Sequence, residues 1–191
     1  MRTKRLLDLG LVLATAPLFL FVTAVLAMGV WVMDGRPIFF HQPRAGQDRR
    51  LYRIWKLRSM TLEPDPRRRR PTRFGGWMRQ RGLDELPQLL NVLKGDMSLV
   101  GPRPLMPEDV VRFVQQHPSF AARFDVPPGI TGLAQVFGAR GVTLTAQLDG
   151  DYARSRTVAM DLGILLRTLW INLVGKRRGV RQLPPDGRAP R

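Results

Sequence analysis

The chain has 191 residues, and 31 lysines and arginines against 15 aspartates and glutamates give it a formal net charge of +16 at pH 7. This excess favours polyanionic partners such as phosphates, nucleic acid or an anionic membrane surface. Cysteine is absent and only two histidines are present, which excludes disulfides, thiolate nucleophiles and cysteine-built metal sites. Carboxylates must therefore carry any acid–base or nucleophilic chemistry. The length favours a single catalytic domain.

The first element is an uncharged, apolar run from Leu9 to Met33, bounded by Asp8 and Asp34. A straight helix of this length reaches roughly 37 Å, which is enough to cross a hydrocarbon core of about 30 Å. Pro17 lies inside the run and removes one helical hydrogen bond, so a kink or a break is expected there. Three interpretations stay open: a kinked spanning helix, which the length favours, a re-entrant helix-break-helix with Pro17 at the break, and a cleaved signal peptide.

Charge on the two flanks favours the re-entrant interpretation. Basic residues lie on both sides of the run, at Arg2, Lys4 and Arg5 before it and at Arg36, Arg44, Arg49, Arg50 and Arg53 after it. Because positively charged flanks stay on the cytoplasmic side, neither flank is expected to cross the membrane.

Two short β-type runs follow, Pro37–Phe40 and Leu51–Trp55, and the turn-forming residues Pro43–Asp48 between them predict a β-hairpin. A linker over Glu63–Pro71 then carries the basic run Arg67–Arg70. This run is either a solvated loop or a contact for phosphate or lipid headgroups.

Three helices are expected in the remaining chain. Leucines at helical spacing predict a helix over 83–93 that stops at Gly95, and a weaker helix is expected over Asp109–Phe124. An amphipathic helix over Ser155–Val174 either packs on the core or lies in the membrane interface. The resulting fold class is α+β and mainly helical. Its expected divisions are a membrane segment over 1–34, a catalytic domain over 35–178 and a disordered tail over 179–191.

Two adjacent carboxylates, Asp84 and Glu85, begin the helix predicted over 83–93. Near the positive end of a helix an aspartate stays ionised, which suits a carboxylate nucleophile, and the neighbouring Glu85 would help to bind a divalent metal. The structural alternative is that Asp84 only caps the helix while Glu85 faces solvent. Cations on two nearby segments, 56–59 and 101–104, favour a site for a phosphate-bearing substrate.

Taken together, these stretches resemble the bacterial sugar transferases, specifically the monotopic phosphoglycosyl transferases that begin glycan assembly on a polyprenol carrier. The resemblance covers the basic and hydrophobic N-terminal segment with Pro17, KLRSM at 56–60, LDELPQL at 83–89, NVLKGDMSLVGPRP at 91–104 and PGITGLAQV at 128–136. It implies a monotopic protein on the cytoplasmic face of the bacterial inner membrane, with a re-entrant helix and both termini cytoplasmic. The length matches the minimal catalytic form of the family.

The resemblance also implies a reaction and a set of site residues. A sugar 1-phosphate passes from a UDP-sugar to polyprenol phosphate, UMP is released, and Mg²⁺ is required. Asp84 resembles the nucleophile that becomes a phosphosugar ester, and Glu85 resembles its metal-binding partner. The positions that match substrate-binding and phosphate-binding residues of the family are Lys56, Arg58, Arg103, Gln135 and Arg140.

The expected partners are the UDP-sugar, polyprenol phosphate and anionic membrane lipids, without nucleic acid, and a homodimer is left open. Two other functions are weighed against this one. The chain could be an inactive family member that serves as an assembly subunit, or a membrane-anchored basic protein that binds phosphate groups or nucleic acid and in which Asp84 is structural.

Overall fold

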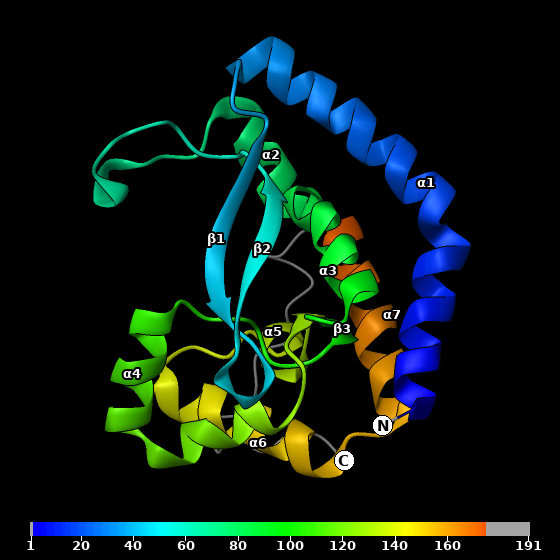
Figure 1. Ribbon diagram of the computed structural model, residues 1–191, viewed down its shortest axis with the longest axis vertical. Helices are drawn as coiled ribbons and strands as arrows, with labels where there is room; N and C mark the ends of the chain where they lie inside the picture. Colours follow the sequence, from blue (N-terminus) through cyan, green and yellow to red (C-terminus); the bar gives the residue numbers. More distant parts are fainter. Residues whose placement is uncertain (1, 175–191) are drawn as a thin grey trace.

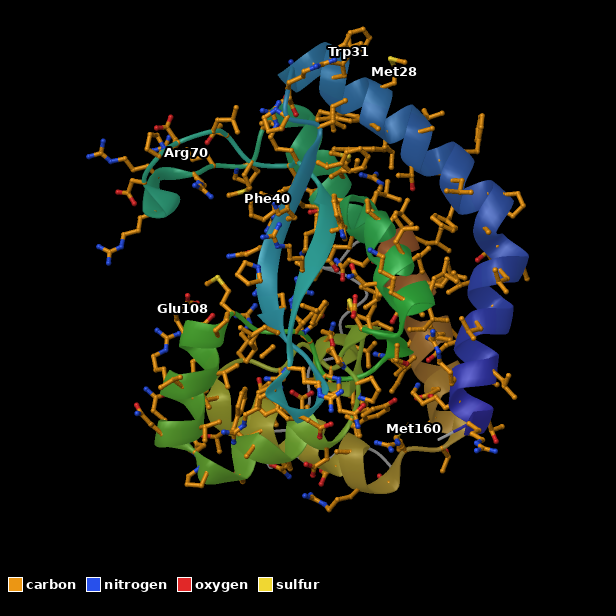
Figure 2. All side chains as sticks on the ribbon, in the orientation of Figure 1. Met28, Trp31, Phe40, Arg70, Glu108 and Met160 are labelled. Carbon is orange, nitrogen blue, oxygen red and sulfur yellow. The ribbon has the colours of Figure 1, made fainter. Side chains whose placement is uncertain are left out.

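The computed structural model describes residues 2–174, and the tail predicted to be disordered over 179–191 lies outside them. The apolar run forms the single helix α1 (Arg2–Asp34), which curves along one side of the molecule (Figure 1). Its buried side chains form one stripe, namely Asp8, Val12, Phe19, Leu26 and Val30. The opposite side exposes large apolar side chains, and Figure 2 shows Met28 and Trp31 pointing away from the rest of the protein.

The predicted helix-break-helix is wrong in one respect, because α1 continues through Pro17. A proline removes a single N–H from the helix, and the hydrogen bonds on either side of it keep the two halves joined. In the described part of the chain, α1 is the one helix whose length and composition suffice to cross a membrane. Whether it enters the membrane re-entrantly stays a prediction.

The predicted hairpin is confirmed. Strand β1 (Phe39–Ala45) pairs antiparallel with β2 (Leu51–Leu57), and a short 3-10 turn, η1 (Gln47–Arg49), joins them. Strand β1 is longer than predicted, because Pro43 and Arg44 belong to it rather than to the turn. Proline is tolerated there because the hairpin forms a sheet of only two strands, so both are edge strands.

The connection after β2 contains the short 3-10 turn η2 (Pro66–Arg68) and leads into α2 (Arg73–Arg81). The helix predicted over 83–93 is split into the 3-10 helix η3 (Leu83–Gln88) and the α-helix α3 (Leu89–Lys94). Pro87 lies inside η3 and has no N–H to donate, which accounts for the change of helix type. The predicted stop at Gly95 is confirmed, since this residue has a φ of 93°.

The strands β3 (Ser98–Val100) and β4 (Gly129–Thr131) form a parallel pair that the sequence did not predict. Between them lie α4 (Pro107–Gln116) and the 3-10 helix η4 (Pro118–Asp125), where one helix over 109–124 was expected. Pro118 marks the division, as expected for a residue that cannot continue the preceding helix.

The C-terminal part consists of α5 (Leu133–Val136), α6 (Val142–Ser155) and α7 (Val158–Val174). Helix α7 confirms the predicted amphipathic helix, with Ile164 and Ile171 buried and a row of exposed apolar side chains at Leu166, Leu169, Trp170 and Leu173. The main core cluster joins this helix to β3, α5 and α6 through Val100, Val126, Val136, Tyr152, Ile164 and Ile171.

Both ends of α1 are bonded to the globular part of the protein. Near the N-terminus, Lys4 Nζ lies 2.6 Å from Asp161 Oδ2, and Ser98 Oγ donates to Asp8 Oδ2 at 2.7 Å. At the C-terminal end, Thr72 Oγ1 donates to Asp34 Oδ2 at 2.8 Å. The first and last turns of α1 are therefore fixed to the globular part of the protein.

Candidate functional site

Asp84 lies in η3, two residues after Gly82, which has a left-handed conformation with a φ of 69°. Its side chain is buried, and Ser59 Oγ donates to its Oδ2 at 3.0 Å. Arg79 Nη1 of α2 lies 3.9 Å from the same oxygen. Helix α2 can approach Ser59 this closely because residue 75 is glycine, where a Cβ would lie 2.3 Å from the Ser59 carbonyl oxygen. Three chain segments therefore fix the position of the Asp84 carboxylate.

Glu85 is the meeting point of two cations. Lys56 Nζ from β2 and Arg103 Nη2 from the loop after β3 both donate to Glu85 Oε1, at 2.7 and 2.8 Å. Burial by itself would raise the pKa of Glu85, but the charges of Arg103 and Lys56 outweigh it and lower the pKa to about 2. Glu85 is thus an ionised acceptor at neutral pH and not a proton donor.

The two cations have different surroundings. Burial lowers the pKa of Lys56 despite the neighbouring Glu85 carboxylate, whereas that carboxylate raises the pKa of Arg103. The Arg103 side chain is half exposed and can reach a ligand from its place beside Glu85. The structure therefore brings together Lys56, Arg103 and the Asp84–Glu85 pair, as the sequence predicted.

A cleft of about 600 Å³ opens beside this cluster. Glu85, Arg103, Gln135 and Arg140 all line it, so two further predicted residues, Gln135 and Arg140, lie near the carboxylate pair. Much of the remaining wall is apolar and comes from Leu105, Phe113, Phe120, Ile130, Ala134, Val136 and Ile171. The size and the mixture of apolar, polar and charged side chains suit a small organic ligand that carries charged groups.

Arg58 lies elsewhere. Its buried guanidinium donates to the carbonyl oxygens of Gly35 and Arg36, at 2.8 and 3.0 Å, and to that of Asp34. These contacts hold the connection between α1 and β1. The structure therefore places Arg58 in a structural role, and its predicted phosphate contact has no geometric support here.

The donor set at the carboxylate pair fits Mg²⁺. This ion is commonly held by one or two carboxylates together with substrate phosphates and water, and Asp84 and Glu85 are consecutive. Over residues 2–174 the structure has no group of three or more histidine or acidic side chains that could hold a metal. A metal at Asp84 and Glu85 would therefore depend on the substrate for further ligands.

The sequence matches the family described as bacterial sugar transferase over residues 1–175. The chain belongs to this family. A UDP-glucose:undecaprenyl-phosphate glucose-1-phosphate transferase of Caulobacter vibrioides is 39% identical over 87% of this chain and 68% of its own length. The uncharacterized sugar transferase EpsL of Bacillus subtilis is 38% identical over 94% of this chain and 90% of its own length.

Some relatives of the chain are longer. An undecaprenyl-phosphate glucose phosphotransferase of Komagataeibacter xylinus is 38% identical over 88% of this chain, but the match spans only 35% of that protein. Membership of the family makes the chain a transferase and confirms the resemblance found in the sequence.

The sequence assigned no role to four residues around the candidate site: Ser59, Arg79, Arg123 and Asp149. Ser59 lies within the KLRSM motif, which could have identified it. Arg123 and Asp149 line the cleft from η4 and α6, and no short motif marks either residue.

Proposed function

We propose that this chain transfers a sugar 1-phosphate from a UDP-sugar to polyprenol phosphate, through a covalent intermediate on Asp84. The observation that supports this proposal is a buried, hydrogen-bonded Asp84 next to Glu85, which binds Lys56 and Arg103; Glu85 and Arg103 line a cleft of about 600 Å³. The names of the Caulobacter and Komagataeibacter relatives support the same substrate classes.

In the proposed first step, an oxygen of the Asp84 carboxylate attacks the sugar-bearing phosphorus of the UDP-sugar. The bond from that phosphorus to the bridging oxygen breaks, and UMP leaves with the electron pair. The second step reverses the roles, because a phosphate oxygen of the carrier attacks the same phosphorus and the Asp84 carboxylate leaves. The product is polyprenol-diphosphate-sugar. Covalent capture divides one encounter of three partners into two simpler ones.

The residues around Asp84 suit these steps. The hydrogen bond from Ser59 fixes the direction of the carboxylate, and Lys56 and Arg103 supply positive charge where the diphosphate would lie. When bound, Mg²⁺ would be held by Asp84 and Glu85 and would neutralise phosphate charge.

We further propose that the protein is monotopic, on the cytoplasmic face of the bacterial inner membrane. Helix α1 has 33 residues and a length of roughly 50 Å. If it crossed the bilayer, Lys4 and Asp34 would lie on opposite sides, yet both ends are bonded to one globular body. The exposed apolar sides of α1 and α7 support contact with lipid, and the basic residues support contact with anionic headgroups. This position lets a soluble UDP-sugar and a lipid-borne phosphate reach one site.

The test is release of UMP by purified protein supplied with polyprenol phosphate, Mg²⁺ and one UDP-sugar at a time. We expect release with at least one donor and a strict requirement for the acceptor over many turnovers. If no UDP-sugar of a broad panel gives UMP, the chain is an inactive subunit or a binding protein and the proposed function is wrong.

A further inference from the structure

The wall of the same cleft contains a buried ion pair. Arg123 of η4 and Asp149 of α6 have side chains that are 3% and 2% exposed, and Arg123 Nη2 lies 3.2 Å from Asp149 Oδ2. The Arg123 guanidinium also lies over the ring of Phe120, 4.5 Å from its centroid. The pair is therefore enclosed on several sides while it still lines the cleft.

Stability does not explain this pair. Burial lowers the pKa of Arg123 and raises that of Asp149 to about 6, so on both partners the cost of burial outweighs their attraction. Within residues 2–174, Arg123 Nη1 and Asp149 Oδ2 also lack a hydrogen-bond partner. A buried pair that is incompletely hydrogen-bonded is weak evidence for a stabilising role, because apolar side chains of similar volume often serve the fold as well.

The second contact of Arg123 indicates another role. Its Nη2 donates to the backbone carbonyl of Arg103 at 2.5 Å. Backbone hydrogen bonds hold the same loop on either side of that point, from Gly129 N to the Pro102 carbonyl and from Ala45 N to the Leu105 carbonyl. Arg123 thus fixes the residue between them, whose own side chain reaches Glu85 at 2.8 Å.

We propose that Arg123, oriented by Asp149, is a positioning residue that sets the Arg103 backbone and thereby directs the Arg103 guanidinium toward Glu85 and the substrate phosphates. The inference rests on the proposed function and adds to it a route by which α6 and η4 act on the transfer site. One nitrogen of Arg123, Nη2, donates to the Arg103 carbonyl and lies in the ion pair with Asp149, while the planar guanidinium lies over the Phe120 ring. A lysine ammonium has no planar group to stack on that ring and keep the nitrogen in place.

The first measurement uses Arg123→Lys and Asp149→Asn in the full chain, with Asp151→Asn as the matched control. Asp151 lies two residues along the same helix and forms an exposed pair with Arg154. We expect kcat/KM for the UDP-sugar to fall about 10- to 100-fold in the two test variants, since small displacements of a positioned group cost up to about that factor. The control should remain within about twofold of wild type, because an exposed ion pair contributes little to the structure.

A double-mutant cycle distinguishes positioning from a general loss of fold. Arg123→Lys and Asp149→Asn are each combined with Arg103→Met, and kcat/KM is measured together with the thermal unfolding temperature. If Arg123 acts through Arg103, either substitution lowers activity far less in the Arg103→Met background than in wild type. Equal losses in both backgrounds, or wild-type activity of both test variants, would overturn the proposal.

Two further outcomes are separated by the same design. If Arg123→Lys fails to fold, the cycle with Asp149→Asn, which keeps the side-chain volume, decides the question. Wild-type turnover is established first, so a wild-type protein that is inactive with every donor counts against the proposed function. If the wild-type protein is inactive, the same double-mutant cycle is measured on the affinity for the UDP-sugar. Additive losses of affinity count against the positioning role.

Discussion

Asp84 and Glu85 are neighbours in the chain, but their surroundings assign them different chemistry. One oxygen of Glu85 accepts hydrogen bonds from the two cations Lys56 and Arg103. These contacts stabilise the negative charge of the carboxylate and make it a weaker nucleophile. Asp84 instead accepts a hydrogen bond from the neutral hydroxyl of Ser59 at 3.0 Å and lies 3.9 Å from one arginine nitrogen. The difference favours Asp84 as the attacking group and Glu85 as the group that organises charge.

The first prediction concerns Asp84→Asn, which removes the nucleophile's charge at almost unchanged volume. We expect UMP release to fall by at least about a thousandfold, because loss of a nucleophile in other enzymes costs more than that, while the far-ultraviolet circular dichroism stays that of wild type. Asp65→Asn, at an exposed position of the connection before α2, serves as the control. Turnover within about tenfold of wild type would contradict the role of Asp84.

The second prediction concerns the pH dependence of stability at Glu85. Because the folded pKa of about 2 lies below the ordinary value of 4.5, Glu85 stabilises the fold above pH 4.5 and loses this contribution as the pH falls toward 2. The advantage of wild type over Glu85→Gln should therefore be largest above pH 5, at most about 3 kcal/mol, and shrink below pH 4.5. Chemical unfolding at several pH values measures it. A constant difference between pH 7 and pH 3 would contradict the ion-pair cluster.

Residue types indicated which cations could gather near Asp84 and Glu85, but they did not show which way each side chain points. Lys56 lies in β2, and Arg103 lies in a loop pinned at both ends, and both meet Glu85 as expected. Arg58 lies one residue beyond the end of β2, where the alternation of side chains along a strand no longer fixes its direction. Its guanidinium therefore turned out to bind the end of α1 instead.

At the scale of elements, helices and strands with a strong periodic pattern of apolar residues could be predicted from the sequence, and those with a weak pattern could not. The hairpin and α7 show the alternation or helical spacing that makes an element visible in sequence. Helix α6 was not predicted, because its buried side includes Asp149 and Gly150, and these residues interrupt the helical spacing of apolar side chains. The pair β3 and β4 was missed because each strand has three residues and its partner lies about 30 positions away.

The third prediction concerns the bend of α1. Pro17→Ala restores the missing N–H and favours a straight helix, which is long enough to cross the hydrocarbon core. We expect a fraction of the variant molecules to expose the N-terminus on the periplasmic side, as measured by an N-terminal topology reporter. Leu18→Ala is the control, because Leu18 is an exposed neighbour whose substitution leaves the backbone unchanged. An unchanged topology in Pro17→Ala would contradict a role of Pro17 in keeping α1 from crossing the membrane.

At the scale of the whole molecule, α1 connects the surface proposed to contact the membrane with the proposed transfer site. Its first turns contact β3 and α7, and its last turn is bonded to the segment that carries Ser59 and Thr72. The sequence predicted a membrane segment and a site, but it could not predict this joining, since the contacts link residues as far apart as Lys4 and Asp161.

The fourth prediction tests the proposed orientation of the whole protein. The chain lacks cysteine, so single cysteines introduced by Thr3→Cys and Glu63→Cys are unambiguous probes. Both positions are exposed, one in the first turn of α1 and the other after β2. We expect an impermeant thiol reagent to label neither in intact cells and both in inverted membrane vesicles. Labelling of Thr3→Cys alone in intact cells would mean that α1 spans the membrane.

The last prediction separates the covalent step from the complete reaction. If Asp84 takes the phosphosugar before the carrier binds, UMP leaves reversibly in the first half-reaction. The protein should then exchange labelled UMP into the UDP-sugar without any polyprenol phosphate. A direct attack of the carrier on the UDP-sugar would need all partners together, and exchange would then require the acceptor.

The donor for this experiment is the UDP-sugar that supports turnover, because a mismatched sugar would suppress both half-reactions. Chelation of Mg²⁺ and the substitution Asp84→Asn should each stop the exchange, while Asp65→Asn should not affect it. If turnover is established and exchange is still undetectable at high enzyme concentration, Asp84 does not form the intermediate. The transferase activity would stand in that case, and the buried Asp84 would act on the carrier or the metal instead.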